Sequence, residues 1–179
     1  MGSEMCIRDR SDINKAIEEL KLLIKSGCNT AVDATTKDYG RNIHGLKSIL
    51  DVVQDINYII VTGFNRGIYL DYSYYQLNEE KLGEIFISEI EEGIEGTTLK
   101  AGLIKIGVDY MRILPIEFKC IKAAIHAHLT TGIPITVHTT LGTMAHEVLK
   151  ILERYNVDPS AIIFYHSDRN LDPWYWAVS

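Results

Sequence analysis

The sequence predicts an α/β protein built as a partial (β/α)8 TIM barrel, with about five parallel strands alternating with helices. Short apolar segments rich in β-branched residues alternate regularly with amphipathic helical segments. Strands that are apolar on both faces are typical of a parallel sheet. Polar residues collect where these strands end, which is where barrel enzymes carry their sites. A doubly wound open sheet is the competing architecture, but no GxGxxG turn follows an early strand.

The expected elements follow from this alternation. Strands are predicted at Thr30–Thr36, Tyr58–Gly63, Ala101–Val108, Ile133–Thr139 and Ala161–His166. Helices are predicted at residues 11–27, 46–56, 77–94, 115–132 and 142–157, with a loop at 38–45. Ser11 and Asp12 are the N-cap candidates of the first helix, and Pro115 suits the first turn of the fourth. We predict no element that would cover the aromatic segment Trp174–Trp176.

Length and composition limit the classes of function. The chain has 179 residues, whereas a complete barrel typically needs about 250, so we expect a partial domain over residues 11–179. Residues 1–10 show neither helical nor strand periodicity, and we interpret them as a non-native or disordered leader. No apolar run is long enough to span a bilayer, and the formal charge of −6 has no balancing basic stripe. These features argue against membrane and nucleic-acid partners.

The three cysteines, Cys6, Cys28 and Cys120, are far apart in the sequence and form no CxxC pair. Their odd number cannot close into a full set of disulfides. We interpret them as reduced thiols in a cytoplasmic protein.

Three residues on consecutive predicted strands are candidates for chemistry. Lys105 lies among apolar neighbours, where an uncompensated ammonium would be costly to bury. His138 and His166 each end an apolar run and begin a polar loop. Taken singly, a strand-end lysine that reaches solvent and a hydrogen-bonded core histidine are the ordinary interpretations. One ligand-capable residue on each of three successive strands instead indicates a metal site.

Four segments of the chain resemble the phosphotriesterase-related metal hydrolases. VDATTKDYGRN, AGLIKIG, VHTTLGTMAHEVLKIL and YHSDRNLDPWY are similar to the second, fourth, fifth and sixth strand regions of that family. The resemblance covers nearly everything after Arg10. It is specific for the family and does not specify the substrate.

The resemblance implies a ligand set for divalent metal, usually zinc, with two ions per intact site. In the family the fourth-strand lysine, here Lys105, carries a carbamate that bridges the two metals. The fifth- and sixth-strand histidines, here His138 and His166, bind the more exposed metal. The buried metal takes a His-x-His pair and an aspartate from other strands, and His126 and His128 lie in a predicted helix instead. We therefore expect a fragment that spans the second to the sixth strand regions.

The function implied by the resemblance is hydrolysis of an ester, lactone or phosphoester of a small-molecule substrate by a metal-activated water, with the fragment itself inactive. The chain departs from the family at three places. Phe64 and Asn65 follow the third-strand Thr-Gly, whereas lactonases carry a tyrosine shortly after it. Thr140 replaces a common glutamate, and Asp168 is followed by Arg169. Two alternatives remain open. Lys105 could act as a Schiff-base nucleophile in an aldolase-like barrel, or the chain could be a non-catalytic structural or binding fragment. Free strand edges would also favour a homo-oligomer.

Overall fold

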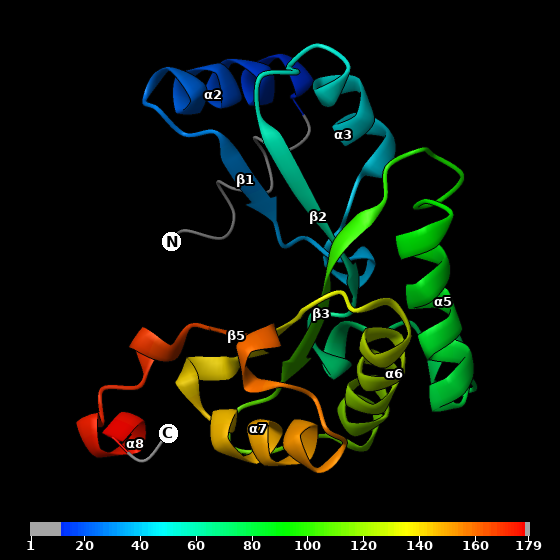
Figure 1. Ribbon diagram of the computed structural model, residues 1–179, viewed down its shortest axis with the longest axis vertical. Helices are drawn as coiled ribbons and strands as arrows, with labels where there is room; N and C mark the ends of the chain where they lie inside the picture. Colours follow the sequence, from blue (N-terminus) through cyan, green and yellow to red (C-terminus); the bar gives the residue numbers. More distant parts are fainter. Residues whose placement is uncertain (1–11, 178–179) are drawn as a thin grey trace.

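The computed structural model describes residues 12–177, and its centre is one parallel sheet (Figure 1). Five strands pair in the order β1-β2-β3-β4-β5, and every pairing is parallel. Crossovers between neighbouring parallel strands share one hand, so a sequential order places the connecting helices on one face of the sheet. An open doubly wound sheet would reverse its order at a switch point. The predicted partial barrel is therefore confirmed.

The elements alternate as the sequence indicates. The strands are β1 (Thr30–Asp33), β2 (Asn57–Gly63), β3 (Ala101–Val108), β4 (Ile135–Thr139) and β5 (Ile162–Tyr165). The helices are α2 (Ile13–Lys25), α3 (Ile43–Leu50), α4 (Tyr72–Tyr75), α5 (Glu79–Glu91), α6 (Pro115–Thr131), α7 (Ala145–Arg154) and α8 (Pro173–Ala177). Short 3-10 turns follow β1, β2, β4 and β5, at Lys37–Tyr39, Gly67–Tyr69, Thr140–Gly142 and Ser167–Arg169.

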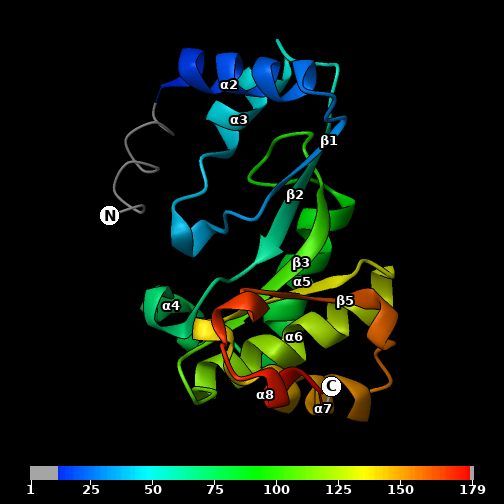
Figure 2. The same cartoon turned by 90° about the vertical axis from the view of Figure 1, so that its left-hand side faces the viewer.

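The main hydrophobic core lies between β3, β4 and the helices α5, α6 and α7. Alternate residues of the two strands point toward the helices and are almost fully buried, as are the helix residues that meet them. The members include Ile104, Ile106, Val108, Ile135 and Val137 from the strands and Leu82, Phe86, Ile121 and Leu152 from the helices. Figures 1 and 2 show α5 and α6 side by side along β3. This packing fixes the strands whose other face carries the candidate site.

Several predicted boundaries are wrong, mostly at the ends of strands. β1 stops at Asp33, three residues before the predicted end, because Thr36 begins a turn in which its carbonyl accepts from Tyr39 N. β4 begins at Ile135 and β5 spans only Ile162–Tyr165, so His166 lies just beyond its strand. β3 has the predicted bounds.

Three helices also differ from the prediction. α3 begins at Ile43 inside the predicted loop, since the Asn42 side chain accepts a hydrogen bond from Gly45 N and starts the helix there. Two short helices, α4 and α8, were not predicted, and helices of one turn carry little periodicity to detect. The Asp12 cap of α2 is confirmed, while Ser11 and the predicted leader at residues 1–10 lie outside the described residues.

Within residues 12–177, no helix is long and apolar enough to cross a membrane. Cys28 and Cys120 are both unpaired, and Cys6 lies outside the described part of the chain.

Candidate functional site

Lys105 points from the middle of β3 toward the carboxyl end of β1. It is only 6% exposed, and its Nζ donates a 2.8 Å hydrogen bond to the carbonyl of Ala34. β2 lies between those strands, and the β2 residue paired with Lys105 is Gly63, which has no side chain to stand in the way. Nζ also lies 5.7 Å from the centre of the Tyr165 ring. The amine is therefore held on the face of the sheet opposite the helices.

His138 lies on the same face as Lys105. The β3–β4 register pairs Lys105 with Thr136 and Gly107 with His138, so these four residues share one side of the sheet. The ring of His138 is half-buried, and its Nε2 is 3.4 Å from the hydroxyl of Thr140. That hydroxyl donates to the Val108 carbonyl at 2.9 Å, so Thr140 serves to hydrogen-bond the loop after β4 to the end of β3.

His166 reaches the site through an unusual backbone conformation. The β4–β5 register pairs His138 with Tyr165, so an extended residue 166 would point to the opposite face. His166 instead adopts the left-handed region, with φ of 67° and ψ of 21°. Its ring centre then lies 4.8 Å from that of His138, at an interplanar angle of 76°. A non-glycine residue in this region carries strain that the surrounding structure must support, as is common at functional sites.

The surroundings of both histidines lower their pKa and so favour the neutral imidazole. Burial, followed in order of importance by the nearby His166, Lys105, Arg66 and Arg169, lowers the pKa of His138 from 6.5 to about 4. Burial also lowers the pKa of His166, with Arg169 and Lys105 acting in the same direction and Asp168 opposing them. A neutral imidazole keeps the nitrogen lone pair that binds a metal.

The three side chains fit a divalent metal as donors. Two adjacent neutral imidazoles are typical ligands of zinc. Among the described residues, no group of three His, Cys, Asp or Glu side chains gathers closely enough to hold an ion. A metal at the histidine pair would therefore require Lys105, or a ligand other than those residue types, to complete its protein coordination.

The four other histidines of the chain lie on the helices α3, α6 and α7. His44 and His126 are exposed on α3 and α6. The Nδ1 of His128 lies 2.8 Å from the Ile133 carbonyl at the end of α6, and His146 packs its ring 4.4 Å from that of Tyr175 on α8. Leaving these four out of the site is consistent with their positions.

Comparison with known proteins places the chain in a family. The model of the phosphotriesterase family matches residues 3–175. The chain belongs to the phosphotriesterase family. Members of this family generally depend on a binuclear metal centre.

The similar proteins include named hydrolases. The phosphotriesterase homology protein of Escherichia coli is 35% identical over 160 residues, which cover 87% of this chain and 54% of that protein. A phospho-furanose lactonase of Mycoplasmopsis synoviae is 32% identical over 180 residues, covering 92% and 51%. The crystal structure of a lactonase from Listeria monocytogenes superposes with a TM-score of 0.87 at 33% identity, covering 93% of this chain and 56% of that one. The chain thus spans about half the length of the relatives it matches.

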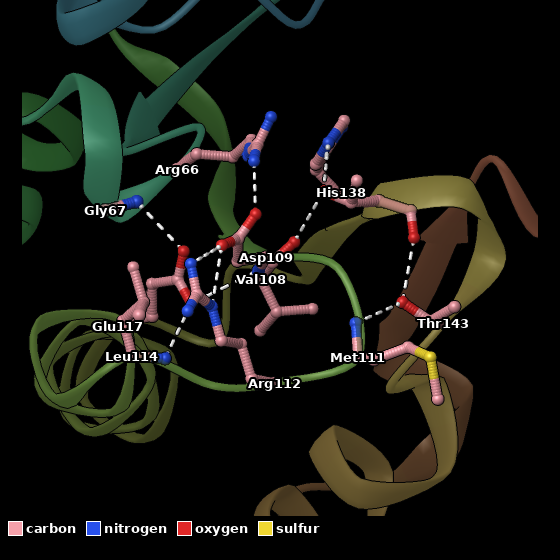
Figure 3. Close-up of polar contacts among 11 residues, drawn as sticks. Arg66, Gly67, Val108, Asp109, Met111, Arg112, Leu114, Glu117, His138 and Thr143 are labelled. Atoms are coloured by element: carbon pink, nitrogen blue, oxygen red, sulfur yellow. Dashed lines mark hydrogen bonds and ion pairs between the residues drawn. The ribbon is translucent and has the colours of Figure 1, made fainter.

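A network of charged residues beside His138 was not predicted from the sequence (Figure 3). Asp109, directly after β3, binds the guanidinium of Arg66 through one carboxylate oxygen and that of Arg112 through the other. Glu117 is almost fully buried and accepts hydrogen bonds from the backbone N–H groups of Gly67, Asp109 and Leu114. An acidic residue right after a strand is the signal that could have identified Asp109, since barrel sites lie at that end.

Close backbone packing at Gly107 brings this charged network near His138. A Cβ atom at residue 107 would lie 1.7 Å from the Asn65 carbonyl oxygen and 3.1 Å from the His138 Cβ. The backbone of the loop after β2 therefore packs directly on β3, with His138 on the neighbouring strand. In this phosphotriesterase-family chain, Arg66 and His138 are neighbours because residue 107 has no side chain.

Phe64 faces away from the candidate site. It is buried in the main core, with ring centres 4.8 Å from Tyr74 and 5.5 Å from Phe86. Phe64 therefore contributes to the packing of the loop after β2 on α4 and α5.

Proposed function

We propose that this chain forms part of the active site of a metal-dependent hydrolase, in which Lys105, His138 and His166 bind a divalent metal such as zinc. The observation that carries the proposal is the placement of three ligand-capable side chains on one face of the sheet, with the rings of His138 and His166 4.8 Å apart and Lys105 on the strand next to that of His138. The substrate class we propose is a small-molecule ester, lactone or phosphoester. Relatives named as lactonases and as an aryldialkylphosphatase support that range.

Each ligand has a separate role in the proposal. His138 and His166 offer imidazole nitrogens, and partial burial lowers the pKa of both rings and so favours the neutral form that binds a metal. Lys105 is buried among apolar neighbours, which favours the neutral amine that adds carbon dioxide to give a carbamate. A bound divalent metal supplies an activated water and polarises the oxygen of the bond under attack.

The described residues supply three ligands for a centre that is generally binuclear in the family. We therefore expect the 179-residue chain to bind one divalent ion weakly and to hydrolyse esters slowly at most. Asp168 is exposed and acts electrostatically on His166, and we propose it as a candidate for moving a proton at that side of the site.

Calorimetric titration with zinc in bicarbonate buffer tests the proposal. We expect one binding event, weakened at least about tenfold by Lys105→Ala, His138→Ala or His166→Ala, since each removes a ligand. His126→Ala is the matched control, because it removes an exposed imidazole from α6. Equal zinc affinity in the control and all three ligand variants would contradict the proposal. Zinc-dependent cleavage of a lactone, an aryl ester and a phosphotriester would then identify the substrate class.

A Schiff-base lysine is the second candidate, favoured by the burial of the Lys105 amine. Borohydride treatment with a carbonyl compound would trap it as a stable adduct on Lys105. Such an adduct, combined with zinc affinity that is independent of Lys105, would favour the aldolase-like function over the hydrolase.

A further inference from the structure

We propose that Arg66 forms a binding subsite, next to the histidine pair, for an oxyanion group of the substrate, either a phosphate or a carboxylate. The inference deepens the proposed function, on which it rests for the position of the reacting bond. The subsite itself depends on the arginine and on the loop that holds it.

The position of Arg66 is fixed from two sides. It follows Asn65, whose carbonyl oxygen packs on Gly107, and the Cβ of His138 lies on the neighbouring side of that glycine. Figure 3 shows the guanidinium extended from the loop after β2, with its outer nitrogen directed to the same side of Asp109 as the ring of His138. A group held by this nitrogen would therefore lie beside the histidine pair.

The guanidinium is held in place before any ligand arrives. The backbone N–H of Arg66 donates to an Asp38 carboxylate oxygen at 3.3 Å, and the Nη2 donates to Asp109. The Tyr69 ring lies 5.6 Å from the guanidinium carbon, within the range of a cation–π contact. Preorganisation of this kind lowers the entropic cost of binding a ligand.

Arg66 nevertheless keeps hydrogen-bonding capacity. Its Nε is buried and has no hydrogen-bond partner, and its Nη1 makes no hydrogen bond to any described residue. The single carboxylate of Asp109 is shared with Arg112, so it does not neutralise both guanidiniums. Arginine donors are the groups that proteins use to bind phosphate and carboxylate oxygens, with charge-assisted hydrogen bonds.

Two cationic side chains border the His138 ring. The whole chain has a formal charge of −6, yet Arg66, from the loop after β2, and Arg169, from the turn after β5, both lie near that ring. Their guanidiniums can attract and orient an anionic group of the substrate.

If Arg66 has only a structural role, substitution of Arg66 and substitution of Arg112 should have the same effect on anion binding. If Arg66 binds the ligand, only its own substitution should weaken binding. Both arginines pair with Asp109, but the Arg112 side chain is 65% exposed and comes from the segment between β3 and α6. In Figure 3 it lies on the far side of Asp109 from His138. Substitution of either residue removes the same charge and the same partner, whereas only Arg66 faces the site.

The test is a titration of the metal-free 179-residue chain with inorganic phosphate and, separately, with acetate, followed by NMR of the backbone amides and arginine Nε–H groups. We expect saturable binding with the largest shifts at Arg66 and the residues beside it. Arg66→Gln should weaken binding at least about tenfold, through loss of charge-assisted hydrogen bonds, and Arg112→Gln should change it less than about twofold. Tighter binding of phosphate or of acetate would show which oxyanion the substrate carries.

Three outcomes would overturn the subsite: no saturable binding by the unsubstituted chain, unchanged affinity in Arg66→Gln, or an equal loss in Arg112→Gln. If Arg66→Gln does not fold, Arg66→Lys decides the question, because lysine keeps the charge near Asp109 but lacks the planar set of donors. We expect Arg66→Lys to bind phosphate at least about threefold more weakly, and equal affinity would reject the subsite. Zinc titration of the same variants separates the two proposals, since Arg66→Gln should change zinc affinity far less than His138→Ala does. Absent zinc binding alongside intact phosphate binding would reject the hydrolase proposal and leave the subsite standing.

Discussion

The β1 side of the sheet and the β3–β4 side are packed in different ways. β3 and β4 are covered by α5, α6 and α7, and seven of the eight residues of β3 are buried. At the other end of the molecule no residue of α2 is buried, and Val32 on β1 is 46% exposed (Figure 1). Lys105 and His138 arise from the densely packed strands, whereas the residue directly after β1, Ala34, contributes its backbone carbonyl. Two of the three proposed metal ligands, Lys105 and His138, are thus positioned by the part of the chain with the most buried apolar surface.

The loosely packed side is attached by a small apolar cluster, which includes Ile43, Ile60 and Ala101, and by polar contacts. The Arg41 side chain is 2% exposed, and its guanidinium donates to the Val61 carbonyl and forms a two-point ion pair with Glu89 on α5. A buried ion pair gives geometric definition but often little net stability. We infer that the β1 side can open locally while β3 and β4 retain their arrangement. The four predictions below test this account of the packing.

The largest effect is expected from Gly107→Ala. Its Cβ would collide with the Asn65 carbonyl, so the loop after β2 would have to leave β3. We expect a loss of roughly 3 kcal/mol or more in the free energy of unfolding, or failure to fold, measured by urea denaturation. Gly102→Ala is the control on the same strand, because its Cβ would meet only an Ile59 methyl group at 3.1 Å. Equal stability of the two variants would show that the close approach at residue 107 is not required.

A pair of leucine substitutions compares the two sides directly. Leu152 on α7 is fully buried, so Leu152→Ala should cost about 2–5 kcal/mol in the free energy of unfolding. Leu22 on α2 is 64% exposed, and Leu22→Ala should cost less than about 0.5 kcal/mol. Similar losses in thermal or urea unfolding would mean that α2 packs as firmly as α7.

Acid should destabilise the metal-free chain in part through His138. Its pKa is lowered to about 4 in the folded state against 6.5 ordinarily, so between these values the unfolded chain binds a proton that the folded chain does not. This contribution to stability is present above pH 6.5 and is lost as the pH falls toward 4. His138→Gln should therefore reduce the pH dependence of unfolding in this window, whereas His126→Gln should leave it unchanged. A steeper dependence in His138→Gln would contradict the assigned environment.

The smallest effect is expected at the helix caps. Asp12 caps α2 and Asn78 caps α5, each by accepting a backbone N–H hydrogen bond. Asn78→Ala should lower global stability by about 1 kcal/mol, because α5 belongs to the main core. Asp12→Ala should instead increase amide exchange within α2 and change global unfolding less. Global losses of equal size would remove the distinction between the two sides.

The sequence predicted the fold well where periodicity was strong. The bounds of β3 were predicted correctly because eight consecutive residues are apolar apart from Lys105 and the glycines. The ends of β1 and β5 were misplaced, because a turn that starts with Thr36 or His166 leaves no break in residue type. α4 and α8 are too short to show a helical pattern.

The candidate site was predictable in its residue types but not in its geometry. Lys105 and His138 follow from their places on the strands, since alternation sets the face that each occupies. His166 does not, because its strand position alone would put it on the wrong face and only the left-handed backbone brings it back. The contact of Asn65 with Gly107, and with it the position of Arg66, depends on two loops far apart in the sequence.

The central claim is that His138, His166 and Lys105 bind the same metal ion. Zinc K-edge X-ray absorption of the chain loaded with one equivalent of zinc tests this most directly. We predict two imidazole nitrogens at about 2.0 Å, with one lost in His138→Ala or His166→Ala and an oxygen neighbour lost in Lys105→Ala. A coordination shell without imidazole, or one unchanged when both histidines are replaced, would contradict the account.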